Sequence, residues 1–226
     1  MTLSDIDSRV ANNIDRDDID STQRLIWIND AQRRICRSHN FSFMESESNT
    51  SLVASQRNYL LPASSGSNLR FKAEISLEII SSGNDRERLK RIFKQDAEKN
   101  DRYISTTETG TPKMYSIQKG QIYLYPMPNA TLTMNLEYYG FLDDLEDDTD
   151  TNALVANYPE VLEALATSFG FRYIFEEERA NYWEQKAQGQ IQEMILEDIS
   201  NKYGNIQEGM EPESGAGITP YPNWLY

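Results

Sequence analysis

The chain has 226 residues, of which 38% are hydrophobic and 11% aromatic, so it can bury one core of ordinary domain size and is not a disordered chain as a whole. Acidic side chains outnumber basic ones by 36 to 22, which gives a formal charge of -14. A surface with this excess repels phosphate groups and lacks the basic side chains that release counterions from nucleic acids, so a general DNA or RNA binder is excluded.

The cysteine count and the hydrophobic segments indicate where the protein is made. Cys36 is the single cysteine, so an intrachain disulfide framework is excluded and synthesis in a reducing compartment fits. The first residues lack the basic and apolar regions of a secretion signal, and no run approaches the length of a membrane span. We therefore expect a protein that is made soluble in a cytoplasm and has no membrane partner.

The first clear element is a helix over residues 21–39. Asp20 stands at the N-cap position and Gln23 follows three residues later, which is the pattern of a capping box. Apolar residues recur along this helix at helical spacing and are Leu25, Ile26, Trp27, Ile28, Ala31 and Ile35. We expect the helix to be buried on more than one side and to end at His39, where an imidazolium suits the helix dipole.

From residue 41 to residue 142 the hydrophobic residues recur with a period of two, as in β-strands. The clearest strands are expected over residues 72–79 and 131–138. Their inward residues are Ala73, Ile75, Leu77, Ile79, Leu132, Met134, Leu136 and Tyr138. Lys119 and Gly120 predict a hairpin turn, and alternation with one polar face predicts an antiparallel sheet. A short helix is expected over residues 93–102.

Residues 143–156 are expected to form an acidic linker. Its carboxylates are Asp143, Asp144, Glu146, Asp147, Asp148 and Asp150. A calcium-binding loop that started at Asp148 would need glycine where Ala153 stands and glutamate where Pro159 stands, so the spacing fails this test. A solvated run of charge is therefore the first interpretation, and a metal site is not expected.

Two helices are expected over residues 157–204. Pro159 falls in the first turn of the first helix, a break is expected near Arg179, and Gly204 ends the second helix. Their inward residues recur at helical spacing and are Leu162, Leu165, Phe169, Tyr173, Trp183, Ala187, Ile191, Met194 and Ile195. Because the connection is short, we expect the two helices to pack as an antiparallel hairpin.

Residues 205–226 are expected to form an extended arm. Glycines and prolines oppose regular structure there, yet the last residues are strongly apolar and include Pro220, Tyr221, Pro222, Trp224, Leu225 and Tyr226. Aromatic side chains lose little rotamer entropy when they bind, so such a segment suits docking on a partner protein. Folding of the arm back onto its own domain is the alternative.

Taken together, these elements predict an α+β fold. The N-terminal segment of residues 1–40 and the helix pair of residues 157–204 form a helical scaffold. The antiparallel β region of residues 41–142, with its short helix, is inserted between them. The acidic linker leads from the β region back to the helices, and the arm extends from the C-terminal end.

Catalytic signatures are missing from the sequence. His39 is the only histidine, and Cys36 precedes it by about one helical turn, which is weak support for nucleophilic catalysis. No glycine-rich phosphate loop occurs, so nucleotide binding has no support. We expect no enzymatic activity, no cofactor and no bound metal.

One basic band interrupts the acidic background and consists of Arg86, Arg88, Lys90, Arg91 and Lys94. Acidic residues are interleaved with it, so a solvated or ion-paired face is the first interpretation. The second interpretation is a contact between this band and an acidic face of a neighbouring subunit.

Several short motifs follow one another in order along residues 20–203. They are Trp27-Ile28-Asn29-Asp30-Ala31-Gln32, Phe41-Ser42-Phe43, Tyr59-Leu60-Leu61-Pro62, Gly110-Thr111-Pro112-Lys113-Met114-Tyr115, Gln121-Ile122-Tyr123-Leu124-Tyr125-Pro126-Met127-Pro128 and Leu136-Glu137-Tyr138-Tyr139. With the acidic segment and the paired C-terminal helices, this order resembles the head-to-tail adaptor, or connector, proteins of tailed bacteriophages. The P22-like tail accessory factor and the T7-like tail tubular protein A are examples of that family.

This resemblance implies a structural subunit of the virion that is synthesised in the host cytoplasm. It implies a closed ring of about twelve copies beneath the portal protein, which extends the DNA channel and presents a platform for the tail tube or nozzle protein. The arm would reach into the portal and the basic band would contact a neighbouring subunit. The acidic side chains of residues 143–150 would face the channel and let genome DNA pass without specific binding.

Two alternatives stay open. Another neck completion protein or a tail terminator would keep the structural class and change the place in the particle. A metal-dependent hydrolase would need paired carboxylates on rigid elements, whereas the densest carboxylates lie in a linker-like segment.

Overall fold

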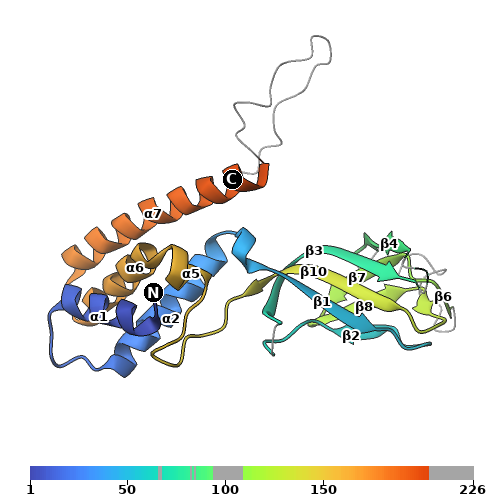
Figure 1. Ribbon diagram of the computed structural model, residues 1–226, viewed down its shortest axis with the longest axis horizontal. Coiled ribbons are helices and arrows are strands. Elements are labelled where there is room, and N and C mark those ends of the chain that lie inside the picture. The colour runs from blue at the N-terminus through green and yellow to red at the C-terminus, as the bar shows by residue number, and fades with distance from the viewer. Residues whose placement is uncertain (66–67, 82, 84, 94–108, 204–226) are drawn as a thin grey trace, which may run out of the picture.

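The computed structural model describes residues 1–65, 68–81, 83, 85–93 and 109–203. A helical lobe and a β lobe lie side by side along the long axis of the molecule (Figure 1). The helices are α1 (Leu3–Ile14), α2 (Ser21–Ser38), α5 (Ala153–Asn157), α6 (Pro159–Tyr173) and α7 (Glu177–Tyr203). The β lobe is inserted between α2 and α5, which confirms the predicted α+β class. No helix in the described part of the chain is long and apolar enough to cross a membrane.

Helix α2 is the centre of the helical lobe. The carboxylate of Asp20 accepts a hydrogen bond from the backbone N–H of Gln23 at 2.7 Å, so the predicted N-cap is confirmed. His39 is the C-cap. The helix buries residues on several sides, namely Trp27, Ile28, Asn29, Ala31, Gln32, Ile35 and Cys36. A helix this buried is positioned mainly by packing against its neighbours.

Helix α1 is an element that was not predicted. Its buried residues recur every three or four positions and are Leu3, Ile6, Val10 and Ile14. Thr2 and Asp5 form a capping box at its start. The backbone N–H groups of Leu3 and Ser4 bond to carbonyl oxygens of the acidic segment, so α1 and that segment hold each other in place.

The predicted helix pair is confirmed, but its break lies at residues 174–176 and not near Arg179. The chain turns there because Phe175 takes a left-handed conformation with φ 62°. The N–H of Glu176 then bonds to the carbonyl of Phe171 at 2.9 Å, and the N–H of Phe175 bonds to that of Arg172 at 3.1 Å. This pattern is the Schellman motif, which ends helices.

Most inward residues of this helix pair are buried or half-buried as predicted, but Tyr173 is 56% exposed. It occupies the last position of α6, where the helix passes beyond the edge of the core. Its ring packs against Trp27 with 5.5 Å between the ring centroids.

The β lobe contains two four-stranded sheets, in the orders β1-β10-β3-β4 and β2-β8-β7-β5, and a small pair of β6 with β9. A short 3-10 helix, η1 (Ser42–Met44), precedes it. The strands are β1 (Glu45–Ser51), β2 (Asn58–Leu60), β3 (Arg70–Ile80), β4 (Arg86–Arg88), β5 (Lys90–Arg91), β6 (Thr109–Gly110), β7 (Met114–Gln118), β8 (Gln121–Tyr125), β9 (Met127–Pro128) and β10 (Thr133–Phe141). The lobe has its own apolar core, built from side chains of both four-stranded sheets.

The predicted alternation holds only in part in both β10 and β3, since Asn135, expected on the outward face of β10, is buried. Met134, Leu136 and Tyr138 are buried, but Ala73 and Ile75 do not reach the core. The register of β3 against β10 shifts between Glu137 and Tyr138 and again between Tyr139 and Gly140, and such bulges turn side chains to the other face. The predicted hairpin joins β7 to β8, with positive φ at both Lys119 and Gly120.

Several predictions fall on residues outside the described part of the chain. The helix expected over residues 93–102 has only its first residue among the described ones. Lys94 and the whole arm of residues 205–226 also lie outside them.

Candidate functional site

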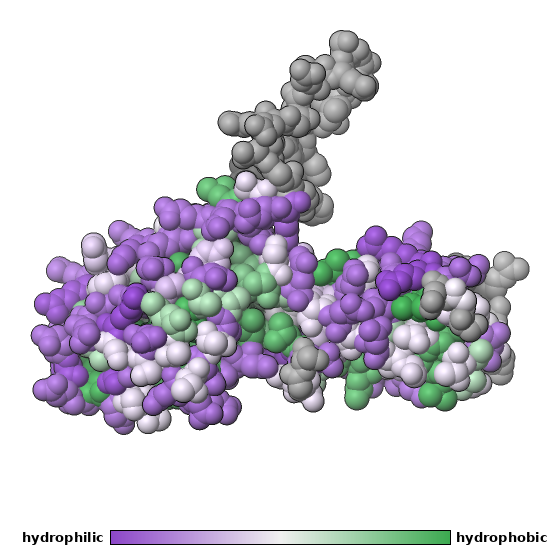
Figure 2. All heavy atoms as spheres, in the orientation of Figure 1, coloured by the Kyte–Doolittle hydropathy of each residue, from purple (hydrophilic) through white to green (hydrophobic). Residues whose placement is uncertain are grey.

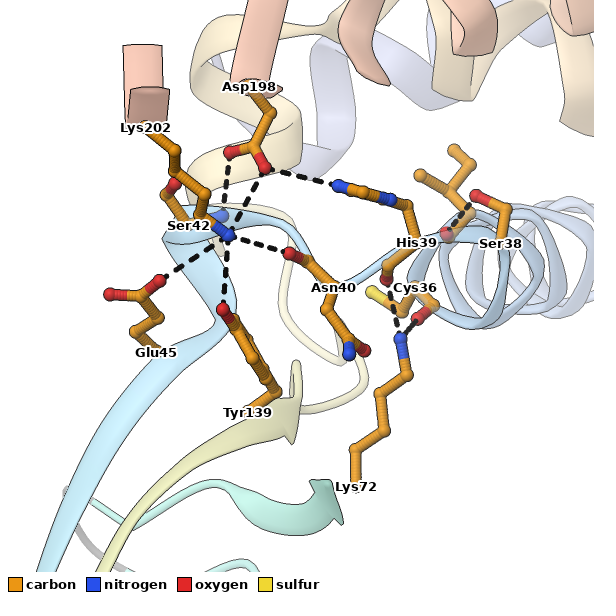
Figure 3. Close-up of polar contacts among 11 residues, drawn as sticks. Cys36, Ser38, His39, Asn40, Ser42, Glu45, Lys72, Tyr139, Asp198 and Lys202 are labelled. Carbon is orange, nitrogen blue, oxygen red and sulfur yellow. Dashed lines mark hydrogen bonds and ion pairs between the residues drawn. The ribbon is translucent and has the colours of Figure 1, made fainter. Parts of the chain in front are cut away.

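The last turn of α7 is fastened to the junction between the two lobes (Figure 3). The Asp198 carboxylate accepts a hydrogen bond from the backbone N–H of Ser42 at 2.8 Å. Its other oxygen lies 3.3 Å from Nε2 of His39 and 3.3 Å from Nζ of Lys202. The side chain of Asp198 is 9% exposed, so it meets these partners largely out of water. We call His39, Ser42, Glu45, Tyr139, Asp198 and Lys202 the junction clamp.

Lys202 links both chain crossings between the lobes to α7. Its ammonium donates to the carbonyl of Asn40 at 2.9 Å and to the hydroxyl of Tyr139 at 3.2 Å. It also lies 3.5 Å from the carboxylate of Glu45. Because Asn40 precedes β1 and Tyr139 lies near the end of β10, one side chain holds the outgoing and the returning strand together.

The electrostatics of the clamp favour its charged form. Desolvation tends to raise the pKa of Asp198, but the hydrogen bonds from Ser42 and the charge of Lys202 outweigh it, so the pKa lies below its ordinary value. Desolvation tends to lower the pKa of Lys202, but its bonds to Tyr139 and Asp198 outweigh this and raise the pKa. The pair is therefore ionised throughout the neutral pH range.

A second lysine ties β3 to the end of α2. The ammonium of Lys72 donates to the carbonyl oxygens of Cys36 and His39. Burial lowers the pKa of Lys72 and raises the pKa of the Cys36 thiol. The buried thiol is thus held in its neutral, unreactive form, as expected of a packing residue.

The acidic segment is folded against the helical lobe. The Asn29 side chain donates to the carbonyl of Leu145 and accepts from its N–H, both at 2.9 Å, and Leu145 is buried. The Asp150 carboxylate accepts the backbone N–H groups of Asp147 and Glu146, which lower its pKa. The segment expected to be a linker is therefore an anchored structure, and its last part contains α5.

We call Asp143, Asp144, Glu146, Asp147, Asp148 and Asp150 the acidic ridge. All but Asp150 are classed as exposed, and Asp150 is half-buried. The ridge borders a cleft of about 530 Å³ between the lobes, whose other wall carries Arg33 and Arg70. Arg33 pairs with Asp144 and Ser64 donates to Asp143, so these two carboxylates are tethered, as is that of Asp150, while Glu146, Asp147 and Asp148 are exposed.

The described part of the basic band bridges the edges of the two sheets. Arg86 and Arg88 lie on β4, Lys90 and Arg91 lie on β5, and all four are exposed. The buried Leu89 stands between the two strands. Arg91 pairs with a carboxylate of β3, that of Glu74, at 2.5 Å, and Arg86 with the carboxylate of Glu78, also on β3, at 3.5 Å. The band is thus partly ion-paired and retains exposed positive charge.

An aromatic residue stands at the turn between α6 and α7. The Phe175 side chain is 90% exposed in the left-handed conformation that glycine usually supplies at this position. A left-handed residue with a side chain costs about 1–2 kcal/mol relative to the right-handed form. The subunit bears this cost without burying the ring, so packing within the subunit does not explain the residue.

Within the residues that the structure describes, no group of three or more histidine, cysteine, aspartate or glutamate side chains could hold a metal ion. His39 is engaged by Asp198, and Cys36 is buried.

Comparison with protein families decides the identity. The model of one family, described as SU10 adaptor protein, matches residues 1–208. The chain belongs to this family of phage adaptors. The match spans both lobes and the whole of α7, so the adaptor is a structural component of a phage particle with a head-to-tail role. No curated protein matches the adaptor.

The adaptor family confirms the resemblance derived from the order of motifs, while the narrower likeness to P22-like and T7-like members stays a prediction. The arm, the basic band and the acidic ridge also stay predictions as contact sites. The junction clamp was not predicted, since Asp198 and His39 are 159 positions apart in the chain. Two signals could have suggested it: an acid and a base spaced four residues apart at the end of α7, and a histidine at the end of α2.

Proposed function

We propose that this adaptor is a non-enzymatic structural subunit that forms a ring below the portal protein, extends the DNA channel and docks the tail. The observation that carries the proposal is the family match over residues 1–208, which covers both lobes and all of α7. A ring of about twelve copies needs two different complementary faces on each subunit, and the chain offers several surfaces of distinct chemistry.

The proposed portal contact is the arm. It follows α7, whose last turn is held in a defined place by the junction clamp. Its apolar end would supply the anchors, which are Pro220, Tyr221, Pro222, Trp224, Leu225 and Tyr226. Aromatic residues are the commonest hot spots of protein interfaces.

The remaining surfaces are assigned by charge and polarity. The acidic ridge is proposed to face the channel, where its exposed carboxylates would repel the DNA backbone and let the genome slide past. The basic band, including Lys94, is proposed to contact an acidic face of a neighbouring copy. On the face shown in Figure 2, apolar residues gather at the junction and at the outer end of the β lobe. That outer end is proposed to meet the tail tube or nozzle protein.

A neck completion protein or tail terminator is the alternative place in the particle for the same structural class. The arm favours direct portal contact, because its aromatic end is suited to docking on a partner protein. A metal-dependent hydrolase gains no support from any cluster in the described residues.

Removal of residues 205–226 is expected to weaken binding to purified portal rings by about tenfold or more, because each aromatic anchor of an interface contributes on the order of 1–2 kcal/mol or more. The measurement is a pull-down with titrated portal, in which the full chain and the truncated chain are compared. A full-length chain with Asn205 and Gln207 replaced by alanine is the control. Equal portal binding by the truncated and full-length chains would exclude the arm as the portal contact.

A further inference from the structure

The turn between α6 and α7 forms a projecting acidic and aromatic tip. Phe175 stands at its apex and is 90% exposed. The next residues are Glu176, Glu177 and Glu178, and the last two are exposed and form no ion pair with the described part of the chain. An exposed aromatic ring can pack against apolar surface, and the unpaired carboxylates beside it can bind basic side chains at the edge of that surface. We call these four residues the tip.

A groove of about 480 Å³ lies between α2 and α7. Its lining residues are Arg34, Ser38, Gln185, Gln188, Gly189, Ile191 and Gln192. A Cβ atom at Gly189 would have no atom within 4 Å, so the glycine is not required by the packing of its own subunit. Glycine in the middle of a helix is unfavourable, and it is used where another chain approaches the backbone closely.

The groove adjoins a cavity that carries several arginines, and Arg34 lines both. Arg37 is exposed, and within the residues described it has no ion pair or hydrogen bond. An adjoining cavity of about 610 Å³ is lined by Arg33, Arg34, Arg37 and Arg70 together with Asp30 and Phe169. Arg33 and Arg34 are already paired with carboxylates of the same chain, so Arg37 is left to meet the carboxylates of the tip.

The tip cannot fill the groove of its own subunit. Glu177 and Gly189 lie on the same helix, α7, and twelve helical residues separate them by about 18 Å. When the tip of one copy binds the groove of a second copy, the first copy still has a free groove and the second copy still has a free tip. Such a contact is heterologous, and every tip and every groove is occupied only when the copies close into a ring.

We propose that the tip of one subunit inserts Phe175 beside Gly189 in the α2/α7 groove of the next subunit, with Glu177 and Glu178 facing Arg37. The contact rests on the proposed ring and specifies the surfaces that build it. It gives the left-handed phenylalanine and the mid-helix glycine one shared role.

Two variants separate this contact from the stability of the subunit. Phe175→Gly relieves the left-handed backbone, so it is expected to keep or raise the melting temperature of the full chain while it lowers subunit association at least tenfold. Gly189→Trp fills the groove and is expected to lower association to the same extent, whereas Gly189→Ala lowers it less. Leu60→Ala removes another exposed apolar side chain and is the control. Association is measured by sedimentation velocity of the full chain, alone and with portal rings.

Cross-linking tests the pairing directly. Glu176→Cys and Gln188→Cys chains, which keep Phe175 and Gly189, are mixed and treated with a short bismaleimide, which adds to one thiol on each chain. Cross-linked dimers are expected in the mixture and not in either variant alone, while Cys36 stays unreacted because it is buried. Dimers between Gln188→Cys and a chain with Asn223→Cys, in place of the expected pair, would assign the groove to the arm and overturn the proposal.

The failures of the two proposals are distinguishable. If the unmodified chain assembles on portal and the Phe175→Gly and Gly189→Trp chains assemble equally well, the tip and groove contact is wrong and the adaptor ring stands. If the unmodified chain does not assemble and the cysteine variants do not cross-link, with or without portal, both proposals are overturned.

Discussion

Replacement of Asp198 by alanine is expected to lower the free energy of unfolding by about 2–4 kcal/mol. The substitution removes the acceptor for the N–H of Ser42 and leaves the ammonium of Lys202 half-buried without its carboxylate on α7. It also removes the partner of His39. Because these contacts hold the junction, amide hydrogen exchange at residues 39–45 and 139–142 should accelerate. Urea unfolding gives the stability, and mass spectrometry of exchange gives the location.

The matched control is Glu193→Ala, which removes an exposed carboxylate from the same helix. It is expected to change the stability by no more than about 0.5 kcal/mol. A loss in the Asp198 variant no larger than in this control would contradict the clamp. Faster exchange spread evenly over the helical lobe would contradict its local role at the junction.

Replacement of Tyr138 by alanine is expected to lower the free energy of unfolding by about 3–5 kcal/mol, as for other large aromatic residues that leave a cavity. Tyr138 is fully buried in the β lobe, and its ring stacks on Phe71 with 5.8 Å between centroids. Because the helical lobe has a separate core, amides of α6 should stay protected when those of β3 and β10 open. Denaturant unfolding and hydrogen exchange together check both statements.

Replacement of Tyr138 by phenylalanine keeps the ring and removes only the hydroxyl, so it measures the contribution of the hydroxyl to stability. The hydroxyl donates to the carbonyl of Leu69 at 2.8 Å, so Tyr138→Phe is expected to cost about 1 kcal/mol. Leu60→Ala, at an exposed site of the same lobe, should stay within about 0.5 kcal/mol of the unmodified chain. If the alanine variant lost no more stability than the phenylalanine variant, the claim that the Tyr138 ring packs in the core of the β lobe would be contradicted.

Local patterns predicted the elements that local physics determines. The cap at Asp20, the turn at Lys119 and Gly120 and the inward position of Tyr138 depend on neighbours within a few residues, and the structure confirms each. The family resemblance followed from the order of such motifs. Helix α1 could also have been predicted, because the spacing of its apolar residues and its capping box are both local features of the sequence.

Features that depend on distant partners were out of reach. The bulges that turn Ala73 and Ile75 away from the core arise from the register of β3 against β10, which the sequence of one strand does not specify. Asp198 looked like an ordinary helix acid until the fold brought it to the junction. Phe175 was expected within a helix, because no glycine marks the left-handed position at the turn between α6 and α7.

The most direct test of the adaptor proposal is electron microscopy of purified portal rings mixed with the full chain. The account predicts a second ring on one end of each portal, with one adaptor subunit for each portal subunit and a continuous channel through both. The acidic ridge should face that channel. Portal rings that stay bare at saturating concentrations of the chain, while the chain remains monomeric in the same sample, would contradict the account.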